Sequence, residues 1–354
     1  MMLYLFLFFA GLLFAYIKFK HFTLRGPIPG LSPHLFFGNI IQTGLLSGRR
    51  VASEVYILLN GQFGDIYQYW LGFIHFVVVH NIDDVQYILS HRNIYDQGQI
   101  FLEKFSILVP NSIICNIGAK FKRHGAFAMP LFRRSKIISN INIVIDGLSR
   151  KELFDEMLMF LIAGYETTST ALAWSIYQLS KNPRVQQKLK TELMQDSSSQ
   201  YLTVHRVDSL IYLDCFINEV LRYSPTIDGT SRSVVVDDCL PKSGIRLYKG
   251  DQVLIPTSAL SRDTRLWNID PEQFYPERFL NEDKNHHPCA LLPFGGGHRQ
   301  CLGQDLARFE LKVILARMLQ QVTFVDGGPE VNAGGFSQTL TIIPKHVGVT
   351  IEFH

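Results

Sequence analysis

The chain has 354 residues, of which 47% are hydrophobic and 18% are charged, and its formal net charge at pH 7 is +3. This composition is typical of a folded globular protein and excludes a disordered or collagen-like chain. Because the charge is mild and no basic run is interleaved with aromatic residues, the sequence does not predict nucleic-acid binding.

The N-terminal segment differs in kind from the rest of the chain. No charged side chain occurs from residue 1 to residue 17, and Lys18, Lys20 and Arg25 then follow. We expect residues 1–20 to form a membrane anchor, with the basic flank placing the body of the protein in the cytosol. The alternative is a cleaved signal peptide, but the segment lacks a basic start and a small-residue cleavage site.

The remaining elements predict a mainly α fold with small peripheral β-sheets. Residues 65–81 are rich in β-branched and aromatic residues around a glycine, which predicts a hairpin. Residues 230–256 predict short strands and turns, and 261–293 a loop punctuated by prolines. Helical patterns and helix-start signals predict helices at 82–90, 151–180, 182–193, 213–225 and about 303–321.

The cysteines are five in number, widely spread and free of any Cys-x-x-Cys pair, which argues against a disulfide framework and a zinc ribbon. One of them, Cys301, lies in the glycine-rich loop "FGGGHRQCLG" (294–303). The loop is not a phosphate-binding loop of either common type. A G-x-G-x-x-G motif would need glycine at Gln300, and a Walker loop would need Gly-Lys-Ser/Thr where "GQD" begins at Gly303.

A thiolate ligand explains this loop better. Glycines allow backbone N–H groups to turn toward a sulfur and allow a flat cofactor to approach closely. The positive end of the following helix favours a deprotonated Cys301, and Arg299 is placed for an anionic group such as a propionate. Taken alone, however, a single cysteine in such a loop is more often a buried structural residue.

The order of residues in the loop resembles a known signature. Five positions match F-x-x-G-x-R-x-C-x-G, the haem-binding motif of the cytochrome P450 family: Phe294, Gly297, Arg299, Cys301 and Gly303. The sequence resembles a microsomal, eukaryotic member of that family. The resemblance implies a cytochrome P450-like fold, a haem b cofactor and Cys301 as the axial ligand of the haem iron.

Two further motifs occur in the order expected for the family. Glu219 and Arg222 resemble its E-x-x-R motif, and Arg278 in "PERF" (276–279) would complete a three-residue ion network. Residues three apart face the same side of a helix, although such a pair on its own is usually a solvated surface contact. A buried network of this kind is expected to fix the fold rather than to add stability.

The stretch "AGYETT" (163–168) resembles the oxygen-activating helix of the family. The resemblance implies that Thr167 bonds to iron-bound dioxygen and that Glu166 is the acid of a proton-delivery chain. It also implies that Arg232 is a second propionate partner. The alternative is a helix whose hydroxyl groups bond back to carbonyl oxygens.

Two departures from the family pattern affect these expectations. The segment 119–127 resembles a helix that usually presents tryptophan and, four residues later, arginine to a propionate, but this chain has Phe121 and Gly125. One propionate is therefore expected to depend on Arg299 and Arg232 alone.

The second departure is an internal gap. Only residues 122–162 separate Phe121 from Ala163, where family members carry several more helices, and the join is expected within 139–147, between about 138 and 148. The haem-thiolate domain, residues 21–354, would then lack central helices. We expect this loss to expose the apolar face formed by Leu158, Phe160, Leu161 and Ala163.

The functional expectation is a haem-thiolate monooxygenase of the endoplasmic reticulum membrane. It would insert one oxygen atom from O2 into a lipophilic substrate, with electrons from NADPH delivered by a flavoprotein reductase. The alternatives are a catalytically impaired, membrane-tethered remnant or splice form, and a haem-thiolate isomerase. Six residues could supply positive charge for reductase docking: Lys122, Arg123, Arg133, Arg134, His298 and Arg308.

Overall fold

The structure is a computed structural model, and it describes residues 2–132, 148–195 and 202–354. The chain forms two compact units. The sheet unit consists of Met1–Ile100 and Gly229–Ala259, and the helical unit of Phe101–Asp228 and Leu260–His354. The residues 139–147, where the sequence predicts the internal join, lie outside the described part of the chain.

The sheet unit is built on five strands in the order β1-β2-β7-β4-β3. β2 and β7 run parallel, and the other neighbouring pairs are antiparallel. Large apolar residues occupy successive positions of β1 and β2 because these strands are buried for most of their length. The strands are β1 (Ile66–Leu71), β2 (Ile74–Val79), β3 (Tyr95–Gln97), β4 (Thr230–Val234) and β7 (Gln252–Ile255).

Helices and a small hairpin accompany this sheet. α2 (Ala52–Phe63) packs its buried residues against β1 and β2, and α3 (Ile82–Ser90) starts at an Asn81 cap. β5 (Asp238–Cys239) pairs with β6 (Arg246–Leu247). Two short helices, α4 (Gln99–Ser106) and α11 (Thr257–Leu260), lie at the boundaries of the two units.

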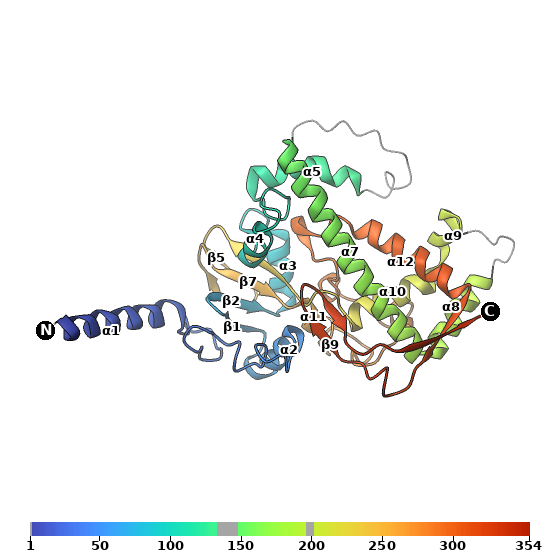
Figure 1. The fold of residues 1–354 in the computed structure, drawn as a ribbon, viewed down its shortest axis with the longest axis horizontal. Coiled ribbons are helices and arrows are strands. Elements are labelled where there is room, and N and C mark those ends of the chain that lie inside the picture. Colours follow the sequence, from blue (N-terminus) through green and yellow to red (C-terminus); the bar gives the residue numbers. More distant parts are fainter. Residues whose placement is uncertain (1, 133–147, 196–201) are drawn as a thin grey trace. The chain divides into compact units, whose positions relative to one another are not determined.

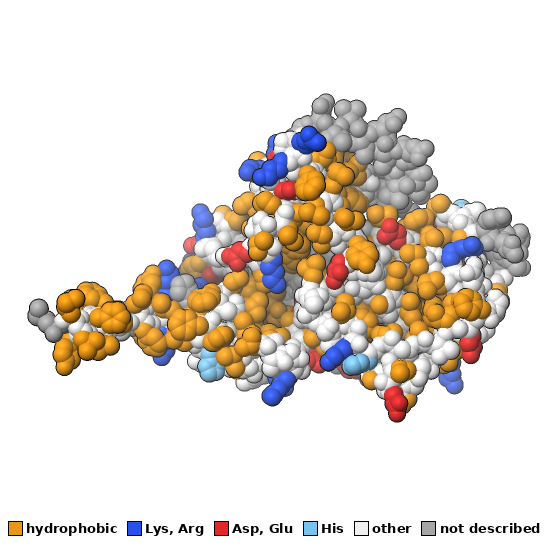
Figure 2. Space-filling view, viewed as in Figure 1, with side chains coloured by type: hydrophobic (Ala, Val, Ile, Leu, Met, Phe, Trp, Pro, Cys, Tyr) orange, Lys and Arg blue, Asp and Glu red, His pale blue; other side chains and the backbone are white. Residues whose placement is uncertain are grey.

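The first helix, α1 (Met2–His21), is long and apolar enough by length and composition to cross a membrane, and its apolar window is not buried in protein. Figure 2 shows it covered with hydrophobic side chains.

The core of the helical unit lies between α7, α8, α10 and α12 (Figure 1). Trp174, Phe216 and Leu315 are among its buried side chains. The helices of this unit are α5 (Gly118–Leu131), α7 (Arg150–Lys181), α8 (Pro183–Met194), α9 (Val204–Ser209), α10 (Ile211–Tyr223) and α12 (Gln304–Leu319). Two antiparallel pairs of short strands complete it: β8 (Val322–Asp326) with β11 (Val349–Phe353), and β9 (Phe336–Gln338) with β10 (Ile342–Pro344).

The observed elements confirm the mainly α class with small sheets. The hairpin turns at Gly72, whose φ of 61° lies in the left-handed region that glycine favours. α7 begins at the Ser149–Glu152 capping box, and α8 begins with proline at its first position. The segment 261–293 is not entirely loop, since Pro276–Phe279 and Pro288–Ala290 form short 3₁₀ helices.

Candidate functional site

The cysteine loop is a closed turn at the start of α12. Gly295 and Gly297 have φ angles of 68° and 69°, which explains why glycine is needed at these two positions. The Cys301 amide donates to the carbonyl of Phe294 across the loop, at 2.9 Å. This bond fixes Cys301 two residues before the N-cap of α12 at Gly303.

Cys301 is exposed to solvent as a residue, although neighbouring protein atoms surround much of its thiol group. Burial raises the pKa of this thiol, and a hydrogen bond from the Gly303 backbone lowers it to a smaller extent. The N–H group at the start of α12 thus favours the thiolate, as expected from the sequence, but in the protein alone desolvation outweighs this contact. A coordinated metal ion reverses that balance, since it deprotonates a ligating thiol.

Arg299 and Phe121 are in direct contact. The Arg299 guanidinium lies over the Phe121 ring, 3.6 Å from its centroid, and the His298 ring meets the same phenyl ring edge-on at 6.2 Å. Phe121 comes from α5, where the family pattern places tryptophan, so the segments around residues 121 and 299 adjoin as the resemblance implies.

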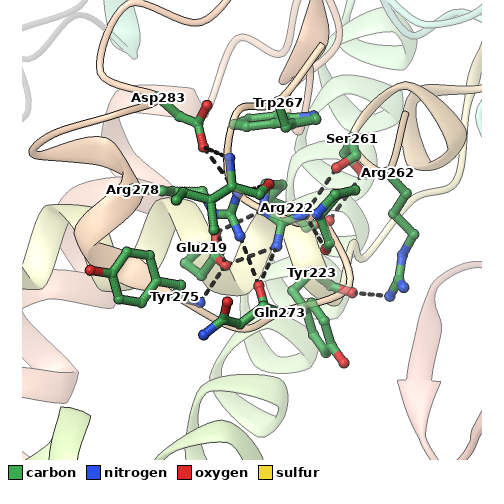
Figure 3. A network of polar contacts seen from close by, with 12 residues as sticks. Glu219, Arg222, Tyr223, Ser261, Arg262, Trp267, Gln273, Tyr275, Arg278 and Asp283 are labelled. Carbon is green, nitrogen blue, oxygen red and sulfur yellow. Dashed lines mark hydrogen bonds and ion pairs between the residues drawn. The ribbon is translucent and has the colours of Figure 1, made fainter. Parts of the chain in front are cut away.

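The predicted ion network is present and completely buried (Figure 3). Glu219, Arg222 and Arg278 each have 0% side-chain exposure. Both carboxylate oxygens of Glu219 accept from Arg222, at 2.7 and 2.8 Å, and Arg278 Nε donates to Oε1 at 3.2 Å. The surface-pair alternative is therefore excluded for these residues.

A fourth charge, not predicted from the sequence, neutralises the network. Asp283 lies 3.1 Å from Arg278, so two guanidinium groups face two carboxylates. The remaining N–H groups of both arginines donate to backbone carbonyls, including that of Gln273. Trp267 stacks over both guanidinium groups, at 5.3 and 5.6 Å. No spacing rule in the sequence singles out Asp283 or Trp267.

The "AGYETT" residues lie in the middle of α7. Thr167 Oγ1 donates to the carbonyl of Ala163 at 2.7 Å, which is the back-bonded arrangement weighed as the alternative. Glu166 Oε1 accepts from the hydroxyl of Thr341 at 2.9 Å, and Thr341 lies 3.1 Å from Thr170. The fully buried Thr341 was not predicted, because it lies 175 residues from Glu166 in the sequence.

Arg232 lies in β4 of the sheet unit and is 2% exposed. Its Nη1 donates to Thr230 Oγ1 at 2.8 Å and to the Ser231 carbonyl at 2.9 Å. Arg299 and Cys301 belong to the other unit, so the expected sharing of propionates between Arg232 and Arg299 stays a prediction.

Comparison with known proteins identifies the protein family to which this fold and this cysteine loop belong. The family model described as "Cytochrome P450" matches residues 28–147 and 140–343. The chain therefore belongs to the cytochrome P450 family. The two matched stretches overlap at 140–147, where the sequence predicts the internal join.

Three relatives show what share of a family member's length this chain covers. It is 41% identical to "Cytochrome P450 3A12" of Canis lupus familiaris over 182 residues, 50% of this chain and 35% of the relative. It is 40% identical to "Cytochrome P450 4V2" of Mus musculus over 208 residues, 58% of this chain and 39% of the relative. It is 35% identical to "Cytochrome P450 monooxygenase claU" of Ampulloclitocybe clavipes over 209 residues, 53% of this chain and 39% of the relative. The chain thus spans less than half the length of these relatives.

Proposed function

We propose that the protein is a haem-thiolate monooxygenase that inserts one oxygen atom from O2 into a lipophilic organic substrate. The observation that carries the proposal is the cysteine loop. Gly295 and Gly297 turn the chain, and the Cys301 amide donates a hydrogen bond to the Phe294 carbonyl. Cys301 itself remains exposed to solvent. These features fit a thiolate ligand of a flat cofactor better than a structural cysteine.

Cys301 would hold the haem iron, and Arg299, with Arg232 as a further candidate, would hold its propionates. When bound, a haem with an axial thiolate supplies the activation of dioxygen. The protein's own contribution is proton handling on α7. Thr341 donates its hydroxyl hydrogen to Glu166 Oε1 at 2.9 Å, so the hydroxyl would pass a proton to the carboxylate only as it receives one from another donor. Thr167 Oγ1, which donates to Ala163, keeps lone pairs that can accept a further hydrogen bond.

The electron donor is proposed to be an NADPH-dependent flavoprotein reductase, and the location the endoplasmic reticulum membrane with the body in the cytosol. α1 and the family membership support this proposal. Two of the expected docking charges have partners within the protein. Arg123 pairs with Glu152, and Arg308, whose pKa is lowered by burial, donates to Asn218 at 2.8 Å. Arg133 and Arg134 lie outside the described residues, and His298 packs edge-on against Phe121. The exposed Lys122 is therefore the best-supported docking charge.

A second candidate, a catalytically impaired form, is supported by an exposed apolar stripe on α7. Phe154, Met157, Leu161 and Tyr165 recur at helical spacing and are 65%, 64%, 68% and 73% exposed. Hydrophobic side chains gather over this part of the helix in Figure 2.

The stripe differs in part from the expected apolar face. Leu161 is exposed as predicted, but Leu158 and Ala163 are half-buried. Phe160 is also half-buried and packs on Phe132 with ring centroids 4.9 Å apart.

Reconstitution of the full chain with a reductase and NADPH tests the proposal. Oxygenated products from a panel of lipophilic probes, formed in proportion to the NADPH consumed, are the expected result. NADPH consumption that yields peroxide but no product would favour the impaired form. A chain that takes up no haem would contradict the proposal altogether.

A further inference from the structure

The contact between Phe121 and Arg299 has the geometry of a stacked cation and ring. The guanidinium carbon lies 3.6 Å from the ring centroid, well inside the 6 Å or so at which such pairs attract each other. Phe121 is itself partly buried, so the contact is shielded from water on one side.

The helix that carries Phe121 is fixed by buried polar contacts. His124, one helical turn further along α5, is completely buried, and its Nδ1 lies 2.5 Å from Glu156 Oε1 on α7. Its Nε2 lies 3.4 Å from Glu152, which also pairs with Arg123. Rotation of α5 would separate these buried groups, so the ring of Phe121 is held on a rigid element.

A phenyl ring differs from the indole of the family pattern in what it can do. It has no N–H group and cannot donate a hydrogen bond to a carboxylate. It can, however, occupy the face of a guanidinium, while the N–H groups of the guanidinium point outward within its plane and keep the fork geometry that binds carboxylates.

We propose that Phe121 is a positioning residue that acts through Arg299: its ring sets the orientation of the guanidinium toward a haem propionate. The inference rests on the proposed function, because it needs a bound haem. Position 121 is where this chain departs from the family pattern. The role proposed for it needs an aromatic ring face but no indole N–H group.

Haem titrations of the full-length apoprotein test this role. Phe121→Leu keeps the apolar bulk and removes the aromatic face, and we expect it to weaken haem binding by about three- to tenfold. Phe121→Tyr keeps the face and should bind haem as the parent does. Phe154→Leu, at an exposed aromatic position of α7, is the matched control and should leave the affinity unchanged.

Two further measurements distinguish an effect of Phe121 on the orientation of Arg299 from an effect on local packing. Phe121→Leu should cause no additional loss in an Arg299→Gln background. Haem dimethyl ester, whose propionates are blocked, should bind the parent and Phe121→Leu equally well. Far-UV circular dichroism checks that each variant is folded.

The outcomes distinguish the two proposals. A parent chain that binds no haem would overturn the proposed function and this inference with it. A parent that binds haem, with Phe121→Leu binding as tightly, would overturn the inference alone. Equal losses for haem and its dimethyl ester would also overturn it, because the ring would then act by packing.

Discussion

Glu219 holds two guanidinium groups, those of Arg222 and Arg278, at a place from which water is excluded. Asp283 supplies the second negative charge, and the network is therefore neutral. Burying four charges confers little net stability, but removing one of them leaves its partners uncompensated. The fold therefore depends on the presence of all four charged side chains of this network.

Replacement of Arg278 by methionine should lower the free energy of unfolding by about 3–5 kcal/mol, because buried Asp283 would lose its guanidinium partner and Glu219 would keep only Arg222. Denaturant titration of the parent and the variant measures this change. Arg265→Met is the control: Arg265 pairs with Asp263, but its side chain is 58% exposed, so we expect a loss below about 1 kcal/mol. Similar losses in the two variants would contradict this description of the network.

A buried histidine in the sheet unit predicts a pH dependence. Burial, with the nearby charge of Arg25, lowers the pKa of His75 to about 4. The unfolded chain, in which His75 has its ordinary pKa near 6.5, therefore binds a proton between about pH 6.5 and 4 while the folded chain does not. Stability from this residue is complete above about pH 6.5 and is lost as the pH falls toward 4.

His75→Gln removes this titration. Between pH 7 and pH 5 the parent should lose about 1–2 kcal/mol more stability than the variant. Unfolding curves at the two pH values, recorded for both proteins, measure the difference. If the parent and His75→Gln lose the same amount, the folded pKa of His75 is not lowered.

At the scale of elements, α7 combines two different environments. Its C-terminal half packs in the core through Trp174 and Leu179, and its N-terminal half bears the exposed stripe. A soluble surface rarely carries such a continuous row of large apolar side chains. We therefore expect self-association through this part of the helix.

The triple variant Phe154→Gln, Met157→Gln and Leu161→Gln should reduce light scattering of the detergent-solubilised protein and leave its stability nearly unchanged, because these side chains are exposed. Met159→Gln, at a position that is 6% exposed, is the contrasting control and should destabilise the protein. Unchanged scattering in the triple variant would show that the stripe does not drive association.

Most helices could be predicted from the sequence because local signals mark their ends. Asn182 and Pro183 start α8, and α10 ends two residues before Pro225. Local patterns could not reveal the Thr341–Glu166 contact or the Phe121–Arg299 stack, because the tertiary fold brings these residues together. Asp283 lies only five residues from Arg278, but no regular helix or strand spacing singles it out. The sequence indicated the helix-end N–H group that lowers the pKa of Cys301, but not the larger opposing effect of desolvation, which depends on the tertiary fold.

At the scale of the whole molecule, the chain is a cytochrome P450 family member that spans less than half the length of the relatives compared. Its cysteine loop and ion network lie in the helical unit, and its apolar first helix belongs to the sheet unit. If α1 is a membrane anchor, carbonate should not extract the protein from microsomes, and added protease should degrade its body. Release by carbonate, or protection of the body, would contradict the proposed topology.

We expect Cys301 to be the thiolate ligand of a bound haem. The carbon monoxide difference spectrum of the reduced protein tests this ligation. The parent should show the Soret band of a thiolate-ligated haem, Cys301→Ser should lose it, and Cys289→Ser, at a buried cysteine outside the loop, should retain it. An unchanged thiolate band in Cys301→Ser would show that another residue ligates the haem.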